Sequence, residues 1–169
     1  MRKNGPAVFK GRHFQEEVIL LCVCWYLRYS LSFRDLEKMM TERGLSVDHS
    51  TIARWVLRYA PLLQTRMRRH LRHPNRSWRV DETYVRVAGR WTYLYRAVDS
   101  EGNTIEQDHR FIKKRIMASQ WFRSIEGALH TIQGYEAMHM LRKGQIRWVK
   151  RGDIIGQVRF VNQVFGLTA

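Results

Sequence analysis

The chain has 169 residues, of which 44% are hydrophobic and 12% aromatic, so it can build a folded core. Lys and Arg number 30 against 15 Asp and Glu, and this formal charge of +15 indicates nucleic acid as the first partner to consider, ahead of an anionic membrane. The longest apolar run, residues 18–27, is too short to span a bilayer, and residues 1–6 lack the features of a signal peptide. We therefore expect a cytoplasmic protein without a membrane partner, in which Cys22 and Cys24 are reduced core residues.

Three helices are predicted before residue 61. Apolar residues at helical spacing indicate a first helix from about residue 13 to 29. Ser32 and Asp35 have the spacing of a capping box for a second helix, and Asp48 is placed to cap a third. The expected inner face of the first helix consists of Phe14, Val18, Leu21, Cys22, Trp25 and Tyr29. The expected inner face of the third consists of Ile52, Trp55, Val56 and Tyr59.

The second and third helices have the order of a helix-turn-helix unit, because a Gly-containing turn joins them and the third begins with polar and basic side chains. In such a unit the start of the second helix enters the major groove, where side chains reach base edges and phosphates. The side chains expected at the DNA are His49, Ser50, Thr51, Arg54 and Arg58. The alternative is a generic three-helix bundle with a solvated basic face.

A basic connector follows. We expect Pro61 to start a helix that ends before Pro74-Asn75, where the first domain, residues 1–76, also ends. Its cations predict contacts to phosphates without sequence specificity, and the alternative is a solvated linker. The cations concerned are Arg66, Arg68, Arg69 and Arg72.

Residues 78–98 predict a β-hairpin, with two β-rich runs on either side of the turn 88–90. Asp81 lies inside the first run, where a buried carboxylate needs a partner, a hydrogen bond or a metal ion. The alternative is an edge strand whose acids face water. A third strand stops after two residues, at Ile105. The remaining patterns are helical: a basic helix that begins at Glu106, a longer one over about residues 125–143 that Gly144 closes, and a short last one over about 154–165. The fold class is therefore α+β and mostly helical.

Several segments resemble bacterial insertion-sequence transposases of the DDE type, in the group called insertion sequence six. They are FKGRHFQ, VDHSTIARWVLRYAP, WRVDETYVRVAGRWTYLYRAVDS, EQDHRFIKKR and GYEAMHMLRKGQIRW, and together they cover nearly the whole chain. The resemblance implies a ribonuclease H-like (integrase-type) catalytic domain over residues 77–169, in which three acids bind two divalent ions, Mg²⁺ or Mn²⁺. By motif, the first acid corresponds to Asp81 and the third to Glu106, which would be the catalytic and metal-binding residues.

The chain departs from that family between these two acids. Only 24 residues, 82–105, separate Asp81 from Glu106, whereas the family has a much longer segment containing further strands and the second acid. We therefore predict an internal deletion near residues 105/106, which reduces the catalytic domain to a hairpin plus helices.

The expected function is DNA transposition at the inverted ends of an insertion sequence, by a homo-oligomer on double-stranded DNA associated with the bacterial nucleoid. The missing acid predicts that strand cleavage and transfer are defective. The alternative is a non-catalytic DNA-binding module that occupies the ends of the element.

Overall fold

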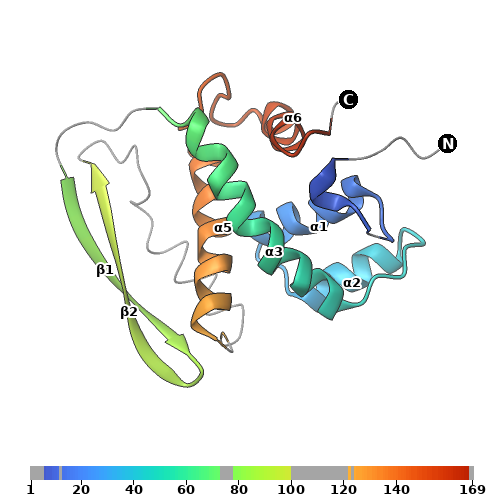
Figure 1. The fold of residues 1–169 in the computed structure, drawn as a ribbon, viewed down its shortest axis with the longest axis horizontal. Helices are drawn as coiled ribbons and strands as arrows, with labels where there is room; N and C mark the ends of the chain where they lie inside the picture. The colour runs from blue at the N-terminus through green and yellow to red at the C-terminus, as the bar shows by residue number, and fades with distance from the viewer. Residues whose placement is uncertain (1–5, 12, 73–77, 100–121, 123, 168–169) are drawn as a thin grey trace.

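The computed structural model describes residues 6–11, 13–72, 78–99, 122 and 124–167, and within the hairpin some of these by backbone alone. A bundle of helices lies beside a long two-stranded hairpin (Figure 1). The elements are η1 (Ala7–Phe9), α1 (Glu16–Arg28), α2 (Phe33–Thr41), α3 (His49–Met67), η2 (Arg68–His70), β1 (Trp78–Val87), β2 (Arg90–Asp99), α5 (Ile125–Lys143) and α6 (Ile154–Val164).

The predicted caps are confirmed where the structure describes them. The backbone N–H of Asp35 donates to Oγ of Ser32 at 3.1 Å, and the N–H of Ser32 donates to Oδ2 of Asp35 at 2.8 Å, which completes a capping box on α2. At the end of α5, Gly144 has φ +73°, the left-handed conformation that a residue without a side chain adopts at little cost. Local hydrogen-bonding rules therefore define the limits of these helices.

The prediction that Pro61 begins a separate helix is wrong. Pro61 lies inside α3, which runs without interruption to Met67. Proline removes one backbone donor from a helix, and its ring crowds the preceding turn. Burial opposes a break here, because Ala60 and Leu63 on either side are 0% and 1% exposed. Tertiary packing thus carries the helix through a residue that ordinarily ends one.

Helix α5 approaches α3 and α1 closely at Gly134. A Cβ atom at Gly134 of α5 would lie 2.5 Å from Cβ of Ala60 and 2.8 Å from Cδ2 of Leu27. Figure 1 shows α3 and α5 side by side along much of their length. The main core therefore extends from α1 and α3 to α5 and α6, across the expected domain limit at residues 76/77.

The predicted inner face of α1 is wrong in part. The residues of α1 that are buried are Ile19, Leu20, Cys22, Val23, Tyr26 and Leu27. Leu21 and Tyr29, both predicted to face inward, are 38% and 47% exposed. They line a groove of about 350 Å³ between α1, α5 and α6, together with Val18 and Trp25. Burial raises the pKa of Cys22 to about 11 and that of Cys24 to about 12, so both thiols stay protonated at neutral pH.

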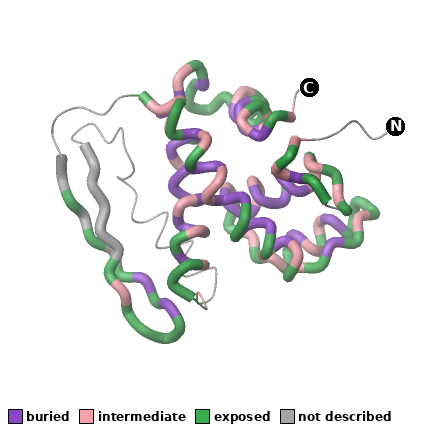
Figure 2. The backbone as a smooth tube through the Cα atoms, in the orientation of Figure 1, coloured by how far each residue is buried: buried purple, intermediate pink, exposed green. Residues whose placement is uncertain are grey.

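The predicted hairpin is confirmed as an antiparallel pair in which Trp78 lies opposite Asp99 and Val87 opposite Arg90. Ala88 and Gly89 both have positive φ, 48° and 80°, as tight hairpin turns require. Val85 and Val87 pack in a small second core with Ala128 and Ile132 of α5 and with Phe122. Figure 2 shows the contrast, with burial concentrated in the helices and little of it in the described part of the hairpin.

Among the described residues, no helix is both long enough and apolar enough to cross a membrane.

Candidate nucleic-acid interface

The start of α3 presents the residues predicted to read DNA. Asp48 caps the helix, and its Oδ1 accepts from the backbone N–H of Ser50 at 2.8 Å. One turn later, Nη2 of Arg54 donates to Oγ1 of Thr51 at 3.0 Å, and Nε donates to the carbonyl of Ser50 at 3.3 Å. Ser50 and Arg54 are exposed, and Thr51 is partly so. The guanidinium is thus held along the outer side of the first turns, where it can exchange these local bonds for base or phosphate acceptors.

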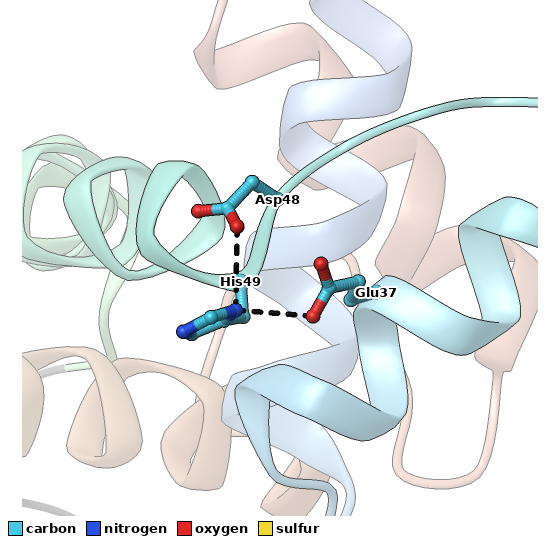
Figure 3. Close-up of side chains that lie close together, drawn as sticks. All are labelled: Glu37, Asp48 and His49. Atoms are coloured by element: carbon cyan, nitrogen blue, oxygen red, sulfur yellow. Dashed lines mark hydrogen bonds and ion pairs between the residues drawn. The ribbon is translucent and has the colours of Figure 1, made fainter.

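His49 is placed differently from this expectation, because it joins α2 to the start of α3 (Figure 3). Its Nδ1 lies 3.0 Å from Oε2 of Glu37 and 3.4 Å from Oδ2 of Asp48. Carboxylates only accept hydrogen bonds, so Nδ1 carries the proton in this arrangement. The side chain is 44% exposed, and its Nε2 is the atom left for an outside partner. His49 therefore links α2 to the start of α3 as well as lying at the expected interface.

Glu37, Asp48 and His49 are also the one group of three metal-ligating side chains within reach of each other in the described residues. The set is a poor match for Mg²⁺, which prefers oxygen ligands throughout, because an imidazole nitrogen lies at its centre. Asp48 is already engaged as the cap of α3, and Glu37 is bonded to His49. The group is explained by helix capping and helix pairing.

The other predicted cations divide into two groups. Arg68, Arg69 and Arg72 are exposed, at the end of α3 and beyond it. Arg66 instead donates from Nη1 to the carbonyl of Val164 at 2.8 Å, and its guanidinium lies 4.9 Å from the ring centre of Phe165. Arg58 is exposed, with its guanidinium 5.8 Å from the ring of Tyr59. Residues 49–80 contain no Asp or Glu, so the exposed members belong to a stretch of sequence that carries only positive charge.

The structure does not bring the two expected catalytic acids together within the part of the chain that it describes. Asp81 lies in β1 with Arg96 of β2 as its register partner. Glu106, and the helix expected to follow it, fall outside the described residues. A divalent ion between these acids therefore has no described geometry.

One set of cations was not predicted from the sequence, in the loop that follows α5. Arg147, Lys150 and Arg151 lie next to η2, because the backbone N–H of Arg147 donates to the carbonyl of His70 at 2.9 Å. A signal was available, since residues 137–152 also lack Asp and Glu. The pairing of this loop with η2 is a tertiary contact between distant segments, and no periodicity in the sequence predicts it.

Comparison with known proteins supports the transposase resemblance. A family model described as a DDE domain matches residues 75–106 and residues 101–145. The chain is 45% identical over 98 residues to a Staphylococcus aureus (strain Mu50) transposase for the insertion sequence-like element IS431mec. It is 44% identical over 98 residues to the transposase for insertion sequence element IS257 in transposon Tn4003 of the same species. The chain is similar to insertion-sequence transposases.

These matches cover 58% of this chain and 44% of each of the two transposases, so the chain spans less than half of the length of the curated relatives it matches. A further match, 51% identical over 39 residues, is to the uncharacterized protein pYV0051 of Yersinia pseudotuberculosis. It covers 23% of this chain and 35% of that protein. No solved structure matches the chain.

Proposed function

We propose that this protein is an insertion-sequence transposase of the DDE type, of the insertion sequence six group, that binds the terminal inverted repeats of its element as duplex DNA. The observation that carries the proposal is the match to a DDE domain, together with 45% identity to a transposase. The helix pair α2–α3 is then a helix-turn-helix unit, and α3 is its recognition helix. The exposed Arg54 at the start of α3 supports this role.

The catalytic part of the proposal is a ribonuclease H-like domain over residues 77–169, in which Asp81 and Glu106 supply two of the three acids. In such a site, paired Mg²⁺ or Mn²⁺ ions would stabilise the attacking and leaving oxygens of a phosphodiester exchange. The described residues contribute one of these acids, Asp81, at a central position of β1. Glu106, the other proposed ligand, lies outside the described residues.

We infer further that the middle of this domain has been deleted near residues 105/106 and that strand transfer is defective. The DDE-domain match supports this inference, because it falls into two segments that meet at residues 101–106. A metal clamp needs its ligands at fixed geometry, and displacement of reacting groups by about 1 Å can cost a hundredfold in rate. Loss of the second acid and its scaffold would cost more.

The active form is proposed to be a homo-oligomer. In the described residues, β1 and β2 pair with each other, and beyond that only an isolated bridge joins Val87 to Phe122. The backbone groups along the outer edges of such a hairpin can pair with a second copy of the chain.

Two assays separate the parts of this proposal. In the first, a duplex carrying the element's end is titrated against the wild type and the Arg54→Ala variant. We expect Arg54→Ala to lose preference for the end over random duplex by roughly 5- to 150-fold, because a good bidentate base contact contributes about 1–3 kcal/mol of discrimination. Arg34→Ala, an exposed arginine on α2, is the matched control. Equal affinity of the wild type for end and random duplexes would refute end recognition.

The second assay measures strand cleavage and joining on the same duplex with Mg²⁺ or Mn²⁺. The wild type should resemble Asp81→Ala, with no cleavage above background. Cleavage that disappears in Asp81→Ala would show that the domain is active and that the inferred defect is wrong, while leaving the transposase assignment intact.

A further inference from the structure

The connector after α3 and the loop after α5, far apart in the sequence, form a short antiparallel pair. Leu71 and Ile146 make a β-bridge. The backbone N–H of Arg72 donates to the carbonyl of Gln145 at 3.0 Å, and the N–H of Arg147 donates to the carbonyl of His70 at 2.9 Å. The pair places residues 68–72 and 145–151 on one side of the molecule, where α3 ends.

The loop itself is held from within. Ile146 is fully buried and Val149 is 6% exposed, so two of its side chains are fixed in the core. It also folds back on Gly144, where an added Cβ would lie only 2.8 Å from the backbone nitrogen of Arg151. The exposed side chains of this loop therefore project from an ordered backbone.

Trp148 is the most exposed large hydrophobic side chain of the loop. Its side chain is 82% exposed, more than that of any other large hydrophobic residue that the structure describes. Its φ is +66°, a strained value for a bulky residue, and its ring centre lies 6.1 Å from that of His70. Backbone strain of this kind persists only where the surroundings impose it, and it is often associated with a functional site. Here the strain holds an indole out into solvent.

Both of the paired segments carry cations. Arg68, Arg69, Arg72, Lys150 and Arg151 are all exposed. Within the described part of the chain, no acidic side chain lies within ion-pair distance of any of them. Residues 49–80 and 137–152 contain no Asp or Glu at all. A flat aromatic face among uncompensated cations is the arrangement with which proteins bind unpaired nucleotides, because bases stack on the ring while cations follow the phosphates.

We propose that these residues form a binding site for single-stranded nucleic acid, which we call the loop surface: Arg68, Arg69, Arg72, Trp148, Lys150 and Arg151. Inside a duplex, neighbouring base pairs cover both faces of each base, so a duplex could use only the cations. The site lies at the C-terminal end of α3, which with 19 residues separates it from the N-terminal end by roughly 28 Å. It is therefore distinct from the duplex-reading site proposed for Arg54, and it does not depend on that proposal.

The test uses the full chain and fluorescently labelled oligothymidylate, oligouridylate and a duplex of equal length. Trp148→Ala should weaken binding of the single strands by about 5- to 150-fold, the effect of losing one stacked base, and Trp148→Phe should retain most of the affinity. Trp91→Ala is the matched control, because Trp91 is 67% exposed on the hairpin. The two single-stranded probes distinguish DNA from RNA as the preferred source. Thermal unfolding should be unchanged in Trp148→Ala, since the side chain makes little buried contact.

A second variant, Lys150→Ala/Arg151→Ala, tests the phosphate contacts. The slope of log affinity against log salt for single strands should fall by about 0.7 for each contact removed. Arg54→Ala should leave this slope unchanged, so failure of duplex recognition and failure of the loop surface give different results. The proposal is overturned if Trp148→Ala binds single strands as the wild type does. It is also overturned if Trp91→Ala loses as much affinity, or if all variants change duplex and single-strand binding equally.

Discussion

The helices and the hairpin are stabilised in very different ways. The helical body, by which we mean α1, α2, α3, α5 and α6, shares one core that extends from Phe9 to Phe165. The hairpin buries Val85 and Val87 against α5 and Phe122, while Val80 and Trp91 are 74% and 67% exposed. A two-stranded hairpin is marginal by itself in water. The hairpin's stability therefore depends on α5, whereas the main core of the helical body contains no described residue of the hairpin.

Helix α5 links the two regions because different residues along it contribute to different cores. Ala128 and Ile132 belong to the small core with the hairpin. Tyr135, Met138 and Leu141 belong to the main core, and Gly134 allows the close approach to α3. The candidate DNA-binding residues lie on the helical body, and Asp81 lies on the hairpin. We therefore expect the proposed DNA binding to survive conditions that disorder β1, the strand that carries the proposed catalytic residue Asp81.

The largest effect should come from Tyr59→Ala, which removes a fully buried ring from the main core. The ring of Tyr59 stacks on Phe9 with centres 5.0 Å apart and meets Phe165 edge-on at 6.2 Å. Loss of a buried aromatic side chain costs about 3–5 kcal/mol, through lost burial and the cavity left behind. We expect α1, α3, α5 and α6 to unfold together at a lower denaturant concentration than in the wild type. Circular dichroism measures this unfolding. Thr65→Ala, an exposed change on the same helix, should stay within about 0.5 kcal/mol. A wild-type midpoint for Tyr59→Ala would contradict a shared core.

A smaller and more local effect is expected from Val85→Ala. Its two lost methyl groups contribute about 1–2 kcal/mol of burial to the small core. The hairpin amides should exchange faster with solvent, while the unfolding midpoint of the helical body stays unchanged. Val80→Ala, on the exposed face of the same strand, is the matched control. Hydrogen exchange with equal protection in hairpin and helices, or a lower midpoint for the helices in Val85→Ala, would show that the two regions unfold as one.

The sequence predicted best where a local chemical rule decides the structure. The capping box at Ser32, the cap at Asp48 and the left-handed end at Gly144 each depend on a few neighbouring residues, and all three are present. The hairpin was predictable for the same reason, since its turn at Ala88 and Gly89 interrupts two β-rich runs.

Prediction failed where only tertiary contacts decide. Helix α1 is apolar on nearly every side between residues 18 and 27, so its periodicity could not show which face would meet α3 and α5. By local rules Pro61 should interrupt the helix, but the burial of the residues on both sides keeps α3 continuous. At the candidate interface, the sequence indicated Arg54 and the exposed connector arginines. It could not show that Arg66 bonds to Val164, or that the loop around Trp148 lies beside η2.

The smallest expected effect concerns acid, and it tests the helical body at the start of the proposed recognition helix. Hydrogen bonds from the Ser50 side chain and then from its backbone N–H hold the pKa of Asp48 below its ordinary value of 3.8. A lowered pKa in the folded state means that the ionised carboxylate stabilises α3 at any pH above 3.8. That contribution is lost as the pH falls through 3.8 towards the folded-state value.

Asp48→Asn keeps a capping oxygen but cannot ionise, so its thermal stability should depend less on pH in this acid range than that of the wild type. Asp48→Ala removes the cap and should be less stable than the wild type at neutral pH, with the difference shrinking in acid. The pKa of Asp35 is also lowered, by hydrogen bonds from Ser32. Asp35 is present in both variants, so its loss of stabilisation in acid is common to them and the wild type. Thermal melts at about pH 6 and about pH 2.5 make the comparison. If Asp48→Asn and the wild type lose stability in parallel, the charge of Asp48 does not stabilise α3, and its hydrogen bonds alone define the start of the helix.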